Sequence, residues 1–195
     1  MNERKEFGFT RNRCGCEVCS VWCKHTPGYL VPSDLERLTA GVPDVMTWAR
    51  EHLLASPGLG FFFQGLVVHI PSLIPRYRQD GSCHWLNTDG SCQVWEDSPY
   101  GCAYLSQCQQ SGAEAFKRTD AGRTARAQAF ADNSLYAQIW QMLWEEGYRA
   151  EPNLFKKGLR ALQAILERRT RKKLNQERKV NRKFKKVARQ RKKPK

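Results

Sequence analysis

The chain of 195 residues lacks a long hydrophobic run. Its most apolar stretch, residues 59–74, is interrupted by polar residues, a glycine and Pro71, whereas a membrane-spanning helix needs about 20 consecutive apolar residues. The opening residues, MNERKEFGFTRNR, also lack the apolar segment of a secretory signal peptide. We therefore expect a soluble protein with no membrane span and a cytoplasmic localisation.

Motifs of common enzyme classes are missing as well. The sequence contains no G-x-G-x-x-G loop of the kind that binds nucleotides, and so no recognisable pocket for a nucleotide-type methyl donor. No Ser/His/Asp arrangement or pair of carboxylates stands out, which leaves hydrolase chemistry without support. Whether the protein is an enzyme is left open by the sequence.

Acidic residues are scarce at the C-terminal end. Residues 168–195, here called the basic tail, contain 16 of the 33 Lys and Arg residues and a single acidic residue, Glu177, which gives the tail a net charge of +15 and leaves residues 1–167 at about −1. The sequence therefore predicts a nearly neutral domain over 1–167 and a helical or disordered basic tail over 168–195. Such a tail is suited to RNA or another polyanion, although a solvated arm that binds nothing in particular has the same composition.

Cysteine is absent between residues 23 and 83, yet the chain has eight of them in two groups. Soft thiolates that converge on one metal gather at short spacings in this way, whereas a disulfide framework belongs to small secreted domains. We therefore interpret the cysteines as metal ligands, with one or two ordinary buried thiols among them, Cys14 and Cys108 first. The candidate ligands are Cys14, Cys16, Cys19, Cys23, Cys83, Cys92, Cys102 and Cys108.

The pattern of the remaining chain predicts a mainly α-helical single domain with little β structure, irregular cysteine-rich metal-binding loops and a basic C-terminal extension. The spacing of Ser33 and Glu36 predicts a capping box, and Gly41 is placed to end the helix that follows. One edge strand and an extended segment are expected over 61–78, where two prolines limit regular pairing. Helices are expected over 33–41, over 44–56, twice within 114–149 with a break near 132–134, and from 154 into the basic tail.

The second cysteine group contains a short repeat. Asp80-Gly81-Ser82-Cys83 and Asp89-Gly90-Ser91-Cys92 share one pattern, in which a turn precedes a thiol. No helix of ordinary length is expected between residues 83 and 108. The sequence therefore predicts an irregular region that a metal organises.

Aromatic and imidazole side chains flank the cysteines. His25 and His84 are the candidate non-cysteine ligands, with hydrogen bonding as the alternative role, and His52 and His69 are expected to be structural. The aromatic residues could shield a cluster from water or simply fill the core. They are Trp22, Trp85, Trp95, Tyr100 and Tyr104.

Residues 14–108 resemble the zinc- or iron-chelating cysteine-cluster proteins, often called YkgJ-like. The first motif is C-x-C-x-x-C-x-x-x-C, with Trp22 where the family has the first of two paired cysteines and Cys14 as a possible replacement. The segments CHWL, DGSCQVW and SPYGCAY are similar to the family's C-x-x-L, DG-x-C-x-I-Y and RP-x-x-C-R-x-F elements. Ser98 and Ala103 replace the family's arginines, so an anion-binding role of those arginines is not carried over.

The resemblance implies a cytoplasmic protein that binds iron, an iron–sulfur cluster or zinc. Flagellin lysine methylases look related in this region, but methyl transfer is not carried over. We predict a metal-binding cysteine-cluster protein with a structural or electron-transfer role. The alternatives are an iron-dependent enzyme that modifies a protein or RNA, and a zinc-stabilised RNA-binding adaptor. The expected core of one shared site is Cys16, Cys19, Cys83, Cys92 and Cys102.

Overall fold

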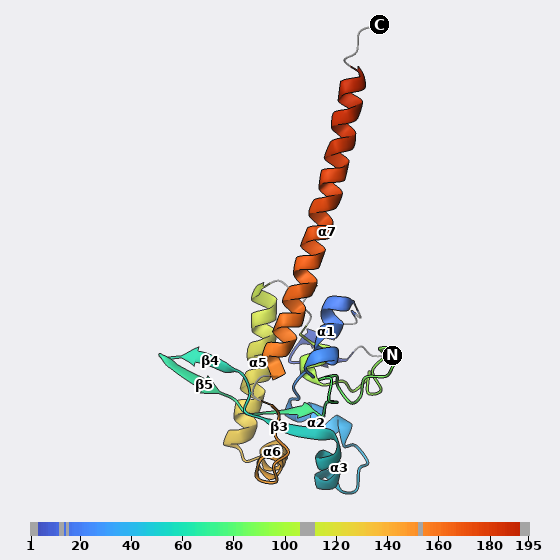
Figure 1. The fold of residues 1–195 in the computed structure, drawn as a ribbon. Coiled ribbons are helices and arrows are strands. Elements are labelled where there is room, and N and C mark those ends of the chain that lie inside the picture. Colours follow the sequence, from blue (N-terminus) through green and yellow to red (C-terminus); the bar gives the residue numbers. More distant parts are fainter. Residues whose placement is uncertain (1–3, 12–13, 15, 106–111, 152–153, 192–195) are drawn as a thin grey trace.

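The computed structural model describes residues 4–11, 14, 16–105, 112–151 and 154–191 (Figure 1). The described chain is mainly helical with little β structure, as the sequence predicts. Its helices are α1 (Glu17–His25), α2 (Pro32–Leu38), α3 (Val45–His52), α4 (Tyr100–Ala103), α5 (Gly112–Ala131), α6 (Leu135–Glu145) and α7 (Leu154–Arg191). Its strands are β1 (Lys5–Glu6), β2 (Phe9–Thr10), β3 (Leu53–Ser56), β4 (Gly60–Phe63), β5 (Leu66–His69) and β6 (Ser72–Pro75).

The strands of the described chain pair into three antiparallel two-stranded sheets, β1–β2, β3–β6 and β4–β5. The β3–β6 pair lies in the core, where Leu53, Ala55 and Leu73 are fully buried. The β4–β5 hairpin instead extends from the body (Figure 1), and Leu66 at its turn is 69% exposed. The central pair is therefore the one around which the helices pack.

Helix α6 covers the central pair with Ile139 and Leu143, both fully buried. The hydroxyl of Tyr136, also on α6, donates to the Leu30 carbonyl at 2.9 Å and accepts from the Leu73 amide at 2.8 Å. Because a buried hydroxyl needs partners, these two bonds fix α6 both to β6 and to the segment that follows α1.

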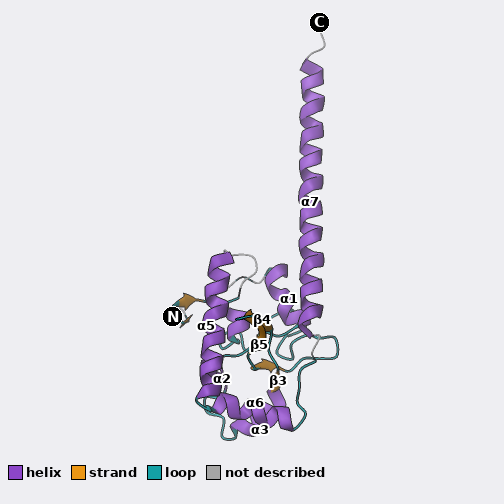
Figure 2. Ribbon diagram, turned by 90° about the vertical axis from the view of Figure 1, so that its left-hand side faces the viewer, coloured by secondary structure: helices purple, strands orange, loops and turns teal. Residues whose placement is uncertain are grey.

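Helix α7 begins against the body and then leaves it (Figures 1 and 2). Leu162 and Ile165 pack on Val18 and Val21 of α1. Beyond that contact, residues 166–180 are exposed on every side. None of the described helices, α7 included, is long and apolar enough to cross a membrane.

Four local predictions are wrong. Ser33 and Glu36 do not form a capping box, because α2 begins at Pro32 and its capping residues are Val31 and Asp34. Cys19 and Cys23 lie in helix α1 and not in an irregular loop. The helix expected over 44–56 ends at His52, because Leu53 and Ala55 turn one face into the core and pair with β6 as a strand. The segment 61–78 contains the hairpin β4–β5 and the core strand β6 in place of a single edge strand. By contrast, the break between α5 and α6 is confirmed, as is the long helix that continues into the basic tail.

Candidate metal centre

Three cysteines at the start of α1 form a compact group, here called the cysteine triad. The sulfur atoms of Cys14, Cys16 and Cys19 all lie within 4.8 Å of one another, and each residue is partly buried. Cys16 is the N-cap of α1 and so lies at the positive end of the helix dipole. Two sulfurs bonded to one tetrahedral zinc are about 3.8 Å apart, given Zn–S bonds of about 2.3 Å. The triad therefore has the size and chemistry of a single-ion site.

The other four described cysteines, Cys23, Cys83, Cys92 and Cys102, form a second group, here called the cysteine quartet. All four are free thiols. The Cys102 thiol donates a hydrogen bond to the Cys23 sulfur. Cys83 and Cys92 both lie close enough to Cys23 for a thiolate there to raise their pKa values further, in addition to burial. The Cys83 amide also donates to the Cys23 carbonyl at 2.8 Å. Helix α1, helix α4 and the loop between β6 and α4 thus bring their thiols to one place.

Burial and mutual repulsion control the protonation of the quartet. Burial raises the pKa of Cys83 to about 12 and also raises the pKa of Cys92. The bond from Cys102 to Cys23 lowers the pKa of Cys23 and raises that of Cys102. Four thiolates at this position need a cation to offset their charge, so metal binding there would release protons.

Backbone amides point at the quartet sulfurs. The Trp85 amide donates to the Cys83 sulfur, and the Val94 amide donates to the Cys92 sulfur, two residues beyond the cysteine in each case. The Gly28 amide donates to the sulfur of Cys102. Hydrogen bonds to sulfur orient thiolate ligands and tune the potential of a cluster. The sulfurs of Cys83, Cys92 and Cys102 therefore each accept a hydrogen bond from a backbone amide.

The repeated sequence motif folds into two equivalent loops. The Asp80 carboxylate accepts from the Ser82 amide at 2.9 Å and from its hydroxyl at 2.6 Å. The Asp89 carboxylate accepts from the same two groups of Ser91 at 2.8 and 2.6 Å. The glycine in each turn has φ of 85°, a left-handed conformation that glycine adopts without steric cost. In each loop the cysteine directly follows the serine that the aspartate binds, so the repeat in the sequence is also a repeat in the structure.

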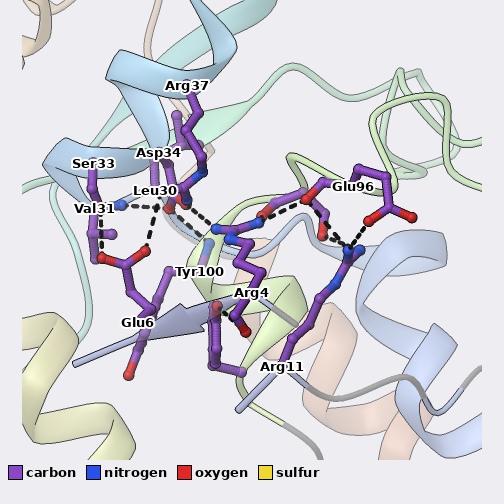
Figure 3. A network of polar contacts seen from close by, with 12 residues as sticks. Arg4, Glu6, Arg11, Leu30, Val31, Ser33, Asp34, Arg37, Glu96 and Tyr100 are labelled. Atoms are coloured by element: carbon purple, nitrogen blue, oxygen red, sulfur yellow. Dashed lines mark hydrogen bonds and ion pairs between the residues drawn. The ribbon is translucent and has the colours of Figure 1, made fainter. Parts of the chain in front are cut away.

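A buried carboxylate holds the second cysteine segment to the N-terminal residues (Figure 3). Asp34 on α2 is fully buried and accepts from the Tyr100 amide at 2.7 Å, just before Cys102 on α4. Arg4 bonds Asp34 at 2.8 Å and the Ser98 carbonyl at 2.8 Å. Arg11 bonds the Ser98 hydroxyl at 3.0 Å. These charge-assisted bonds fix the loop that precedes α4.

The side chains around the thiols have mixed roles. Trp85, Tyr100 and Tyr104 are at most 5% exposed, whereas Trp95 is 42% exposed and stacks on the Arg11 guanidinium. The His84 ring lies 5.2 Å from the ring of His52. Within the part of the chain that the structure describes, neither His84 Nε2 nor His52 Nδ1 has a hydrogen-bond partner. Neither imidazole belongs to the triad, which contains thiols alone.

The sequence predicts the candidate residues but not their grouping. Cys23 lies with the downstream cysteines and not with its neighbours in the first motif. Cys108 lies outside the described residues. Sequence reasoning missed Asp34, Arg4 and Arg11. Arg4 and Arg11 bond residues near position 98, and Asp34 bonds the Tyr100 amide, so these partners are distant in the chain and leave no local signal.

No protein-family model matches the chain, and no curated protein or solved structure shows a significant match to it. The resemblance to the YkgJ-like proteins therefore stays a prediction that depends on its motifs. The geometry of the thiols provides the functional argument.

Proposed function

We propose that the protein binds metal through its cysteines and that the quartet holds an iron–sulfur cluster or iron. The observation on which this depends is the convergence of Cys23, Cys83 and Cys102 with Cys92 from three separate chain segments. The raised pKa values of Cys83, Cys92 and Cys102 keep these thiols protonated without metal, and a bound cation would replace their protons and offset the charge of the thiolates. Soft thiolate sets of this kind suit iron–sulfur clusters and zinc.

The spacing of the sulfurs favours iron over zinc at the quartet. Among the cysteines that the structure describes, the triad is the group whose sulfurs all lie within 4.8 Å, so the quartet is wider than a closed tetrahedral zinc site. A polynuclear cluster separates its ligands further than one ion does, and amide hydrogen bonds to the sulfurs are among the features that set its potential. A structural or electron-transfer role follows from that chemistry, and zinc at the quartet is the alternative.

The triad supplies three thiolates, which leaves one position open on a tetrahedral ion. It is also close to the quartet, because Cys19 and Cys23 are four residues apart on α1 and their Cβ atoms are about 6 Å apart at that helical spacing. An open position next to a cluster is the feature that an iron-dependent enzyme acting on a protein or RNA would need. An iron-dependent enzyme that modifies a protein or RNA is therefore the alternative function of the same metal centre.

The test is metal analysis of the protein purified without oxygen. Iron, zinc and acid-labile sulfide per chain are measured with the visible spectrum for the parent, for Cys83→Ser and Cys102→Ser in the quartet, and for Cys14→Ser and Cys16→Ser in the triad. We expect iron, sulfide and a brown chromophore that either quartet variant abolishes and both triad variants retain. Stoichiometric zinc in a colourless protein would replace the cluster with a zinc site, and absence of any metal would overturn the proposal.

A second function is proposed for α7, namely binding of RNA or another polyanion. Residues 166–180 are exposed all round the helix and include seven Lys or Arg residues, which is the arrangement that releases counterions from a phosphate backbone. Together with zinc at the cysteines, this is the adaptor alternative. The full chain and a chain ending at residue 167 are compared for binding to a labelled single-stranded RNA over a range of salt concentrations. We expect affinity that falls steeply with salt in the full chain and is lost in the shortened one, with metal content equal in both.

A further inference from the structure

A mostly apolar cavity of about 470 Å³ lies between the end of α1, strand β6, helix α5 and the first turns of α7. Trp22, Ile74 and Leu162 contribute to its walls. Leu159 at its edge is 38% exposed, so the cavity reaches the surface. Its volume is in the range of small-molecule sites.

One wall of this cavity contains a buried cation. Arg126 on α5 lines the cavity and is 7% exposed. Its guanidinium donates to the Gly122 carbonyl at 3.0 Å and to the Ser72 hydroxyl, and it lies 4.0 Å from the centre of the Tyr29 ring. No carboxylate pairs with it among the residues that the structure describes. A buried charge with only neutral partners is costly, and an anion in the cavity would offset that cost.

A second polar group faces the same space. The Tyr29 hydroxyl is buried and lacks a hydrogen-bond partner in the described chain, and Tyr29 lines the cavity. A methyl group on Gly122 would lie 2.7 Å from that hydroxyl, so the glycine leaves room for it. Arg123, which lies three residues before Arg126 on α5, also lines the cavity and pairs with Asp120. An unpaired donor and a buried guanidinium therefore converge beside apolar walls.

We propose that this cavity binds a small organic carboxylate with an apolar body. The carboxylate accepts hydrogen bonds from Arg126 and from the Tyr29 hydroxyl, and the apolar part replaces water against Trp22, Ile74 and Leu162. A monoanion fits better than a phosphate, because Arg123 is already paired with Asp120 and Glu151 also lines the cavity, so Arg126 is the cation that remains to offset the charge of a ligand.

The cavity shares a wall with the quartet. Gly28 and Gly101 line it, and a methyl group on Gly28 would lie 2.7 Å from the Cys102 sulfur. Gly28 thus lies between the cavity and the Cys102 sulfur. Binding does not require metal, so the proposal stands apart from the function proposed for the thiols.

The test is calorimetric titration of the full-length protein, as purified without oxygen, with octanoate, 1-octanol and inorganic phosphate. We expect octanoate to bind at least about 10-fold more tightly than octanol, because a hydrogen bond to a charged group accounts for about that ratio or more. We expect inorganic phosphate not to bind, because it has no apolar part to contact the walls. The variants Arg126→Gln and Tyr29→Phe should each weaken octanoate binding about 10-fold or more. Arg149→Gln and Tyr148→Phe, which change residues outside the cavity, serve as matched controls and should bind as the parent does.

Equal binding of octanol and octanoate would overturn the proposal, as would unchanged octanoate binding in both cavity variants. Tighter binding of phosphate, or no binding of octanoate to the folded protein, would do the same. If Arg126→Gln fails to fold, Tyr29→Phe remains a sufficient test, since it removes only a hydroxyl. Without ligand, Tyr29→Phe should unfold at the parent's temperature or above it, because it deletes a buried group that has no partner.

Discussion

Cys102 donates a hydrogen bond from its thiol to the sulfur of Cys23, and this bond joins the two cysteine groups of the sequence. The contact depends on two backbones that approach closely. The Gly101 amide donates to the Tyr29 carbonyl at 2.9 Å, and a methyl group on Gly101 would lie 2.5 Å from the Tyr29 nitrogen. The quartet therefore forms where α4 rests on the segment that leaves α1.

The first prediction concerns that approach. Gly28→Ala should destabilise the protein and lower its metal content, because the added methyl would lie 2.5 Å from the Cys102 nitrogen and 2.6 Å from the Gly101 carbonyl carbon. Overpacking of this kind costs about 1–3 kcal/mol. Thermal unfolding and metal analysis provide the measurement. The matched control is Gly112→Ala at the start of α5, where nothing lies within 4 Å of the added methyl. Equal stability of the two variants would contradict the close approach.

The second prediction concerns Asp34. Asp34→Asn removes the charge that offsets Arg4 and Arg37, both bonded to the buried carboxylate. Breaking a buried ion pair from one side costs about 3–5 kcal/mol. We expect a loss of this size in urea unfolding, together with weaker metal retention because α4 loses its anchor at Tyr100.

The control for Asp34 is Asp44→Asn. Asp44 caps α3 by accepting from the Thr47 amide at 3.0 Å, and it is exposed. Because asparagine also caps helices well, a change well below 1 kcal/mol is expected there. If Asp34→Asn were as mild as Asp44→Asn, the network in Figure 3 would not stabilise the fold.

The third prediction concerns the repeated loops. Asp80→Ala and Asp89→Ala each remove an acceptor for a serine amide and hydroxyl, and with it the turn that positions a cysteine. Residues that orient metal ligands typically contribute 10–100-fold in affinity. Competition with a chelator should therefore show metal affinity about 10-fold lower or more in both variants. Asp97→Ala, at an exposed position in the same segment, should retain the parent's affinity, and a loss there of the same size would show that the effect is not specific to the turns.

The class of fold could be predicted because the helix signals are local. The stripe on α6, the break at residues 132–134 and the start of α7 follow from side-chain spacing and turn residues alone. The repeated turns were equally visible, since Asp, Gly and Ser bond within four residues of each other. Local chemistry thus accounts for the helices α2, α3, α5, α6 and α7 of the described chain.

Long-range partners account for what the sequence did not predict. Residues 53–56 follow α3 with no breaker, and only pairing with β6 makes them a strand. Cys23 has the spacing of the first cysteine motif, yet α1 turns it toward Cys102, which spacing does not encode. Arg4 and Arg11 are unremarkable in the sequence and bond residues near position 98. The division of the cysteines into a triad and a quartet therefore could be seen only in the folded structure.

The last prediction concerns His52 and pH. Burial lowers the pKa of His52 below the usual 6.5, Arg76 lowers it further, and Glu51 opposes them. The folded state then binds fewer protons than the unfolded state just below pH 6.5, so stability is complete above that pH and falls as the pH decreases toward the folded pKa. His52→Gln removes this titration. In urea unfolding from pH 7.5 to 4.5, the free energy of unfolding should then depend less steeply on pH, and the change in slope should correspond to less than one bound proton. His69→Gln, which replaces an exposed imidazole, is the control, and a parent-like slope in His52→Gln would show that this imidazole has no part in the loss of stability at acidic pH.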